Sequence, residues 1–202
     1  MKNMLKDTAI LLIITLISGS ILGFVYELTK DPIALQEEKA KQEAYKEVFT
    51  DAASFEAMTD LDESAMTAVA AQGGYTETSV NEVAKAVDGS GSVLGYVITV
   101  TSHAGYGGDI KFSMGVRSDG TLNGISILSI SETAGLGMRA EEVLKPQFAE
   151  KQVVQFSVTK SGAASDDQID AISGATITSN AVTNAVNAGL YYYQNELEGG
   201  VQ

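Results

Sequence analysis

The residues with the clearest potential for chemistry lie together near the C-terminus, in the run Asp170-Ala-Ile-Ser-Gly-Ala-Thr-Ile-Thr-Ser-Asn180. The run is rich in hydroxyl groups and precedes a segment whose apolar residues recur at helical spacing. Such residues are favoured at a helix start, because their side chains accept hydrogen bonds from the free N–H groups of the first turn. Those N–H groups, and the partial positive charge at the helix start, also suit a phosphate.

Two interpretations of this run follow from its residues alone. Its hydroxyl and amide side chains could simply cap the helix, which requires nothing further. Alternatively, the small residues Gly174 and Ala175 let a ligand approach the backbone closely, beside a helix start that suits an anion. The side chains available for capping are Ser173, Thr176, Thr178, Ser179 and Asn180.

The spacing of this run resembles the flavinylation signature Asp-x-x-(Ser/Thr)-Gly-Ala-Thr, and every fixed position from Asp170 to Thr176 is present. The signature belongs to the FMN-binding domain shared by the G subunits of Rnf electron-transport complexes and the C subunits of sodium-translocating NADH:quinone reductases. In that family a flavin transferase joins FMN through its phosphate to the final Thr. The resemblance therefore implies covalent FMN on Thr176. It also implies local cofactor contacts from Ser173, Gly174, Ala175, Ile177 and Thr178.

Two earlier segments are similar to further elements of this family, in the same order along the chain. Gly105-Tyr-Gly-Gly108 is similar to its Gly-Tyr-Gly-Gly element, and Glu132-Thr-Ala-Gly-Leu-Gly137 resembles the Glu-Thr-Pro-Gly-Leu-Gly element that lies against the flavin ring. Ala134 replaces the usual proline, which affects the rigidity of the turn more than flavin contact. The resemblance implies cofactor contacts from Gly107, Gly108, Glu132, Thr133, Gly135, Leu136 and Gly137.

Composition excludes several classes of function. The net charge is −13, which opposes binding to nucleic acid or to anionic lipid headgroups. The same charge opposes a phosphate ligand, but a covalently tethered ligand cannot leave. The chain has no Cys and one His, His103, so we expect no metal site and no Ser-His-Asp arrangement. Gly135-Leu-Gly137 lacks the third glycine of a dinucleotide-binding fingerprint, which argues against an independent oxidoreductase or hydrolase.

The N-terminal segment predicts a membrane anchor. Residues 8–26 are uncharged, and as a helix they would span roughly 28 Å, about the thickness of a bilayer core. Lys2 and Lys6 precede this run, which predicts a cytoplasmic N-terminus and a domain on the extracellular or periplasmic side. The alternative is a cleaved signal peptide with its small-residue site at Ser18-Gly-Ser20, but the apolar run continues beyond that site.

The remaining pattern predicts an α+β protein with three parts: a membrane anchor over residues 1–30, a helical stalk and packing segment over 31–88, and a domain over 89–202. The resemblance implies that this last part is an FMN-binding domain. Strands are expected at residues 93–102, 110–116, 125–130 and 152–158. A short helix is expected at 139–150 and a long one at 177–197. Residues 49–82 are expected to form short helices and loops.

The resemblance implies an electron-carrying subunit within a membrane complex that transfers electrons between ferredoxin and NAD, coupled to export of Na⁺ or H⁺. Its expected partners are the other membrane, iron–sulfur and flavin subunits of that complex, and the flavin transferase. Two alternatives are a C-type subunit of the sodium-translocating quinone reductase and a membrane-anchored assembly module without redox activity. In the last case, Thr176 would only cap its helix.

Overall fold

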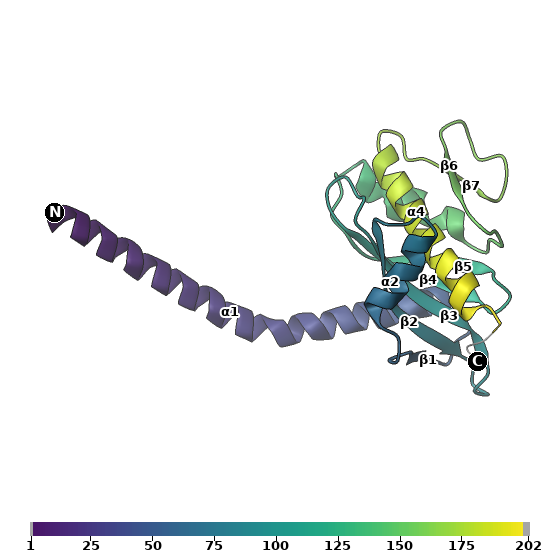
Figure 1. Ribbon diagram of the computed structural model, residues 1–202, viewed down its shortest axis with the longest axis horizontal. Helices are drawn as coiled ribbons and strands as arrows, with labels where there is room; N and C mark the ends of the chain where they lie inside the picture. Colours follow the sequence, from purple (N-terminus) through teal and green to yellow (C-terminus); the bar gives the residue numbers. More distant parts are fainter. Residues whose placement is uncertain (1, 200–202) are drawn as a thin grey trace. The chain divides into compact units, whose positions relative to one another are not determined.

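The computed structural model describes residues 2–199, and its strands and longer helices are labelled in Figure 1. The chain forms two compact units, Met1–Ala40 and Lys41–Gln202. The first unit consists of most of helix α1 (Lys2–Val48), which contains Pro32. The second unit contains the last turns of α1 and all the other elements.

The α1 segment of the first unit has the length and apolar composition of a membrane-spanning helix, and none of its most apolar window is buried by protein. Its large apolar side chains are exposed, with Leu22 at 70% and Phe24 at 68%. The Thr15 hydroxyl donates to the Leu11 carbonyl at 3.0 Å, so its polar group is satisfied within the helix. A helix of this kind is stable in the hydrocarbon core of a membrane. Its backbone N–H and C=O groups form hydrogen bonds within the helix, and its apolar side chains contact lipid instead of water.

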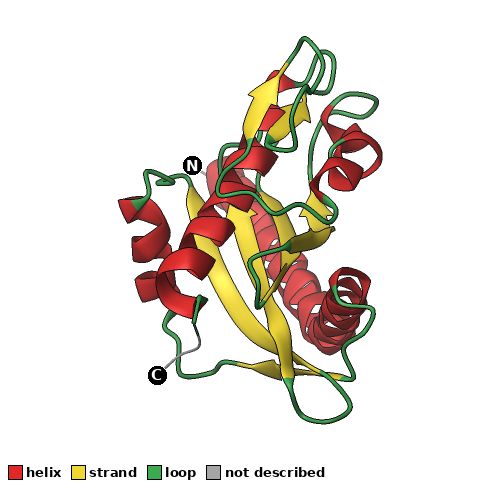
Figure 2. Ribbon diagram, turned by 90° about the vertical axis from the view of Figure 1, so that its right-hand side faces the viewer, coloured by secondary structure: helices red, strands yellow, loops and turns green. Residues whose placement is uncertain are grey.

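The second unit is built on one antiparallel sheet with strand order β1-β2-β3-β4-β5. The strands are β1 (Ser54–Ala57), β2 (Thr78–Val87), β3 (Val93–Ser102), β4 (Ile110–Arg117) and β5 (Leu122–Ile130). The predicted meander over residues 93–130 and the α+β class are confirmed (Figure 2).

The expectation of only short helices and loops over residues 49–82 is wrong. Helix α2 (Glu63–Gln72) lies there, but so do β1 and the start of β2. The β2 sequence mixes Ala84 and Ala86 with Glu82 and Lys85, a composition that does not favour a strand. Its pairing with β3, from Thr78 opposite Ser102 to Val87 opposite Val93, determines its conformation.

Both faces of the sheet are covered. On one face, α4 (Thr176–Tyr192) and α2 pack over the main core, which includes Ile98 and Met114. On the other face, the end of α1 packs Tyr45 and Val48 against a smaller cluster that includes Val97. Successive residues of β3 therefore enter different cores, as the alternation of side chains along a strand requires.

Short elements connect the sheet to α4. They are the 3₁₀ turn η1 (Gly137–Arg139), α3 (Ala140–Val143), the 3₁₀ turn η2 (Lys145–Phe148), β6 (Ser157–Thr159) and β7 (Gln168–Asp170), and the π-helical turn η3 (Tyr193–Leu197) follows α4. The expected strand at 152–158 is wrong in extent, because only β6 forms, and it pairs in parallel with β7. Sequence alone did not reveal that partner.

A buried amide fixes α4 to the chain before β6. Asn187 is 2% exposed, and its Oδ1 accepts the Phe156 N–H at 2.8 Å. Its Nδ2 donates to the Phe156 carbonyl at 2.9 Å. Because both backbone groups of Phe156 depend on this side chain, its loss leaves buried polar groups unpaired.

We predict that Asn187→Ala lowers the free energy of unfolding by about 2 kcal/mol, the cost of unpaired buried polar groups. The matched control is Asn184→Ala on the same helix, where the side chain is exposed. The control should change stability by no more than about 0.5 kcal/mol. Denaturant unfolding measures both, and equal effects would contradict a special role for Asn187.

An ion pair joins the end of α1 to the η2 turn. Glu47 Oε1 lies 2.7 Å from Lys145 Nζ, and the Ser126 hydroxyl donates to Glu47 Oε2. Burial raises the pKa of the Glu47 carboxyl, but the hydrogen bonds from Lys145 and Ser126 outweigh it and hold that pKa below its ordinary value. The Glu47 side chain is 48% exposed, so solvent keeps the pair's contribution below about 1 kcal/mol.

This depressed pKa predicts a pH-dependent part of the stability. A carboxyl whose pKa is lower when folded stabilises the protein above its unfolded pKa of about 4.3 and loses that effect as pH falls through the folded pKa. Wild type should therefore exceed Glu47→Gln in stability at pH 7, and the difference should shrink below about pH 4.3. Thermal unfolding across this range provides the measurement. A difference that grows on acidification would show that the sign is wrong.

Candidate cofactor site

A pocket of about 490 Å³ opens at the N-terminal end of α4, within the size range of small-molecule sites. Three segments that are distant in sequence meet there: the loop after β3, the loop after β5 and the start of α4. The lining residues are Tyr106, Glu132, Thr133, Leu136, Gly137, Gly174, Ala175, Thr176, Ile177 and Thr178.

Thr176 is the first residue of α4, and Ala175 is the N-cap. The hydroxyl-rich run does not cap the helix, since the N-cap residue is Ala175, whose side chain has no oxygen to accept an N–H of the first turn. The Ser179 hydroxyl instead accepts the Ile172 N–H at 2.9 Å and donates to the Ala175 carbonyl at 2.9 Å. Capping by these residues, one of the two sequence interpretations, is therefore wrong for the folded domain.

The Thr176 side chain is half-buried and lines the pocket. Within residues 2–199, its hydroxyl forms no hydrogen bond to another protein group. The first N–H groups of a helix have no partner within the helix, and here no side chain takes their place. The start of α4 thus combines a free hydroxyl with a set of N–H donors, an arrangement that suits a phosphoryl group.

Glu132 connects the three segments. Its Oε1 accepts the Gly107 N–H at 3.1 Å, and its Oε2 accepts the Thr178 hydroxyl at 3.0 Å. Gly107 belongs to the loop after β3, and Thr178 lies in the first turn of α4. One half-buried carboxylate therefore holds both walls of the pocket.

Apolar side chains with high exposure surround the opening. Tyr106 is 71% exposed, Ile177 52% and Leu136 41%. Gly174 adopts a φ of +80°, and a Cβ there would lie 3.2 Å from Leu136 Cδ2, so glycine keeps the entrance open. These side chains provide flat apolar surface suited to an aromatic ring system.

The structure brings most of the predicted site residues together. Nine line the pocket: Glu132, Thr133, Leu136, Gly137, Gly174, Ala175, Thr176, Ile177 and Thr178. Four others, Ser173, Gly107, Gly108 and Gly135, lie in the adjoining loops outside the lining. The sequence analysis missed Tyr106 as a lining residue. A signal for it was present in the sequence: Tyr106 is a large aromatic residue between two glycines, and no apolar residues next to it would bury its ring.

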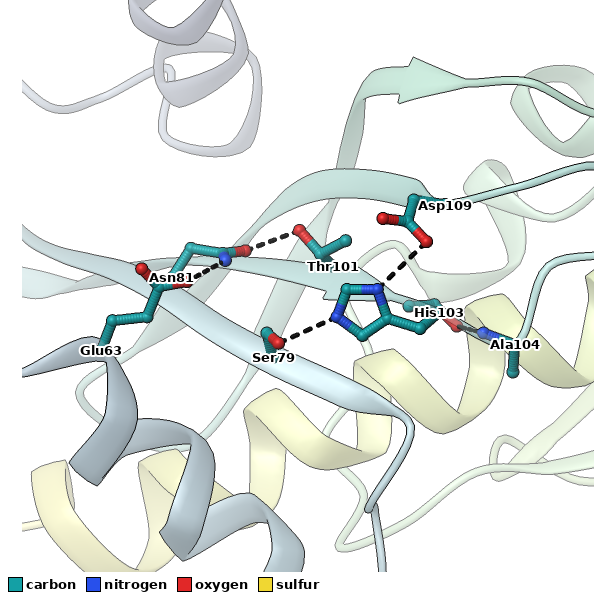
Figure 3. A network of polar contacts seen from close by, with 8 residues as sticks. Glu63, Ser79, Asn81, Thr101, His103, Ala104 and Asp109 are labelled. Atoms are coloured by element: carbon teal, nitrogen blue, oxygen red, sulfur yellow. Dashed lines mark hydrogen bonds and ion pairs between the residues drawn. The ribbon is translucent and has the colours of Figure 1, made fainter.

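The single histidine lies in a polar network beside this site (Figure 3). His103 Nε2 is 2.9 Å from Ser79 Oγ, and His103 Nδ1 is 3.0 Å from Asp109 Oδ1. The expectation that no Ser-His-Asp arrangement exists is therefore wrong, in that the His103 side chain does contact those of Ser79 and Asp109. Yet the His103 and Asp109 side chains are 46% and 62% exposed, and none of the three residues lines the pocket. The network ties β2 to both ends of the loop that carries Tyr106.

Within the described residues, no three His, Cys, Asp or Glu side chains are grouped as a metal site would require. The pocket itself offers hydroxyl groups, one carboxylate and apolar walls, next to the N–H groups at the start of α4. This set can bind and orient an aromatic phosphate-bearing molecule.

Two family comparisons cover different parts of the chain. Residues 105–191 match the FMN-binding domain family, and residues 1–48 match the RnfG N-terminal region. The solved structure of NqrC from Shewanella oneidensis is also similar, with a TM-score of 0.47, 22% identity, and 57% of this chain and 58% of that chain covered.

Curated relatives match along nearly the whole chain. The G subunit of the Na⁺-translocating ferredoxin:NAD⁺ oxidoreductase complex from Acetobacterium woodii is 32% identical, covering 96% of this chain and 93% of the relative. The G subunit of the ion-translocating oxidoreductase complex from Methanosarcina acetivorans is also 32% identical, covering 95% of both. Identity of this level over almost complete lengths establishes the family: the chain belongs to the G subunits of ion-translocating, Rnf-type oxidoreductase complexes.

Proposed function

We propose that this chain carries FMN as a phosphoester on Thr176 and relays electrons within a membrane complex that transfers electrons between ferredoxin and NAD, coupled to translocation of Na⁺ or H⁺. The observation that carries the proposal is the position of the Thr176 hydroxyl. It is free of protein partners among the described residues, it stands at the first residue of α4, and it lines a pocket of ligand size.

The residues present fit FMN. A phosphate next to Thr176 would meet the unpaired N–H groups of the first helical turn and the positive end of the α4 dipole. Leu136, Ile177 and Tyr106 offer apolar surface for the ring. Covalent attachment also removes the difficulty posed by the net charge of −13, since occupancy no longer depends on equilibrium affinity.

The attachment step requires a flavin dinucleotide and a flavin transferase. The Thr176 oxygen forms a new bond to the phosphorus of the FMN half, while the phosphoanhydride bond breaks and a nucleoside monophosphate leaves with its electron pair. The hydroxyl proton passes to a base. Both oxygens of Glu132 already accept hydrogen bonds from other donors, so we assign that base to the transferase.

Bound FMN would supply the electron transfer. The chain's own residues would hold the phosphate at the helix start, cover the ring and limit access of water. Relatives are named as subunits of sodium-translocating and of proton-translocating ferredoxin:NAD⁺ oxidoreductases. We infer the corresponding partners here: the other membrane, iron–sulfur and flavin subunits of such a complex.

We predict that Thr176→Ala abolishes covalent flavin, because the phosphoester needs the hydroxyl oxygen. The full chain is co-expressed with a flavin transferase, and the denatured protein is examined for in-gel flavin fluorescence and peptide mass. Ser157→Ala is the matched control, because that hydroxyl-bearing side chain is exposed and lies outside both the pocket lining and the signature of residues 170–176. It should retain the flavin band. A wild-type chain without flavin under these conditions would refute the proposal.

The charge distribution predicts the side of the membrane on which the pocket lies. Lys2 and Lys6 precede the apolar helix, so we expect a cytoplasmic N-terminus and an extracellular or periplasmic domain. Protease should cleave the domain when it is added to cells or right-side-out vesicles whose cytoplasmic membrane is intact and whose outer face the protease can reach. Complete protection, with cleavage only after lysis, would reverse this orientation.

A further inference from the structure

Glycines at three positions leave room for the Glu132 side chain and its loop. A Cβ on Gly137 would lie 2.7 Å from both Glu132 Cβ and Glu132 Oε2, and 2.7 Å from Thr178 Oγ1. A Cβ on Gly105 would lie 2.0 Å from the Gly108 carbonyl oxygen and 2.8 Å from Glu132 Oε1, and one on Gly107 would lie 2.2 Å from the Ser131 carbonyl oxygen. Any side chain at these positions would displace the carboxylate or its loop.

The carboxylate is held at both oxygens by donors from different segments. Gly107 is an exposed residue, and its N–H donates to Oε1, which ties this loop to Glu132. The Thr178 hydroxyl is buried, and its bond to Oε2 fixes the third residue of α4. Hydrogen bonds to an ionised carboxylate are about twice as strong as neutral ones.

We propose that Glu132 is a positioning residue for the modification of Thr176, acting through Thr178 and Gly107 and not as a base. This inference rests on the proposed function. Thr176 lies two residues before Thr178 on the same helical turn, so the bond from Thr178 to Glu132 sets the rotation of that turn at the pocket. The bond to Gly107 keeps the loop bearing Tyr106 against the same opening.

Loss of the two Glu132 hydrogen bonds, to Gly107 and to Thr178, leaves the Thr176 hydroxyl present but less well oriented. A displacement of about 1 Å at a reacting group can cost up to ~100-fold in rate. A positioning role for Glu132 also differs from a role as general base in which substitution preserves it. Glutamine has the same shape, its carbonyl accepts from Gly107, and its amide donates to the Thr178 oxygen, yet it cannot take a proton.

The hydrogen bonds made by Glu132 can be tested in the absence of flavin, by measuring amide hydrogen exchange on the full-length chain in detergent. We expect Glu132→Ala to accelerate exchange of the Gly107 amide by about tenfold, because that exposed amide loses its acceptor. Glu132→Gln should remain near the wild-type rate. The matched control is Glu142→Ala, since the Glu142 side chain is 77% exposed outside the pocket, and it should leave Gly107 unchanged. Unchanged exchange in Glu132→Ala would overturn the proposal.

The second measurement is the rate of covalent flavin attachment at saturating flavin dinucleotide with purified transferase. We expect Glu132→Ala and Thr178→Val each to slow attachment by at least about tenfold, with KM for the dinucleotide little changed, and Glu132→Gln to stay within about threefold of wild type. If Glu132→Ala does not fold, the attachment rates of Thr178→Val and Glu132→Gln still distinguish a positioning role from a base. A Glu132→Gln rate as low as that of Glu132→Ala would indicate a base and overturn the positioning role.

These outcomes separate the two proposals. If wild type and Ser157→Ala acquire no flavin, the proposed function fails. If they acquire it and Glu132→Ala does so at the wild-type rate, only the inference about Glu132 fails.

Discussion

The site depends on one close contact, the passage of the Glu132 side chain over Gly137 to reach Thr178. A carboxylate shared by two donors holds a flexible loop against a helix start more firmly than apolar contact alone, because its bonds are directional and charge-assisted. The pocket walls are thus fixed by a polar contact, while the pocket itself is lined largely by small and apolar groups.

The rest of the second unit supports that contact. The antiparallel sheet places the loop after β3 and the loop after β5 at the same end, because β4 lies between these strands and is paired with both. Helix α4 crosses one face of the sheet and is fixed further along by Asn187, so its first turn has a defined position. Gln147 binds both the N–H and the carbonyl of Asp170, which orients the segment that leads into the helix.

A free hydroxyl at a helix start is unusual in a run so rich in capping residues. Ser179 and Thr178 are engaged elsewhere, and the N-cap position is occupied by alanine, which cannot cap. The fold therefore leaves the first turn of α4 without side-chain partners beside a pocket. A stabilising cap would be worth about 1 kcal/mol, so this helix start forgoes stability at the place where a ligand phosphate would supply the missing bonds.

The amino-acid sequence by itself determined the features that depend on local pattern. These are the apolar N-terminal helix, the three-strand meander over residues 93–130, the long C-terminal helix and the family resemblance carried by residues 170–176. Tertiary structure alone decided the rest. β2 became a strand because β3 pairs with it, and β6 stays short because its partner is the distant β7. The contact of Glu132 with Gly107 and Thr178 joins residues 25 and 46 positions apart, and the network around His103 reaches back to Ser79. Such contacts depend on where chain segments meet in space, which local periodicity and capping preferences do not specify.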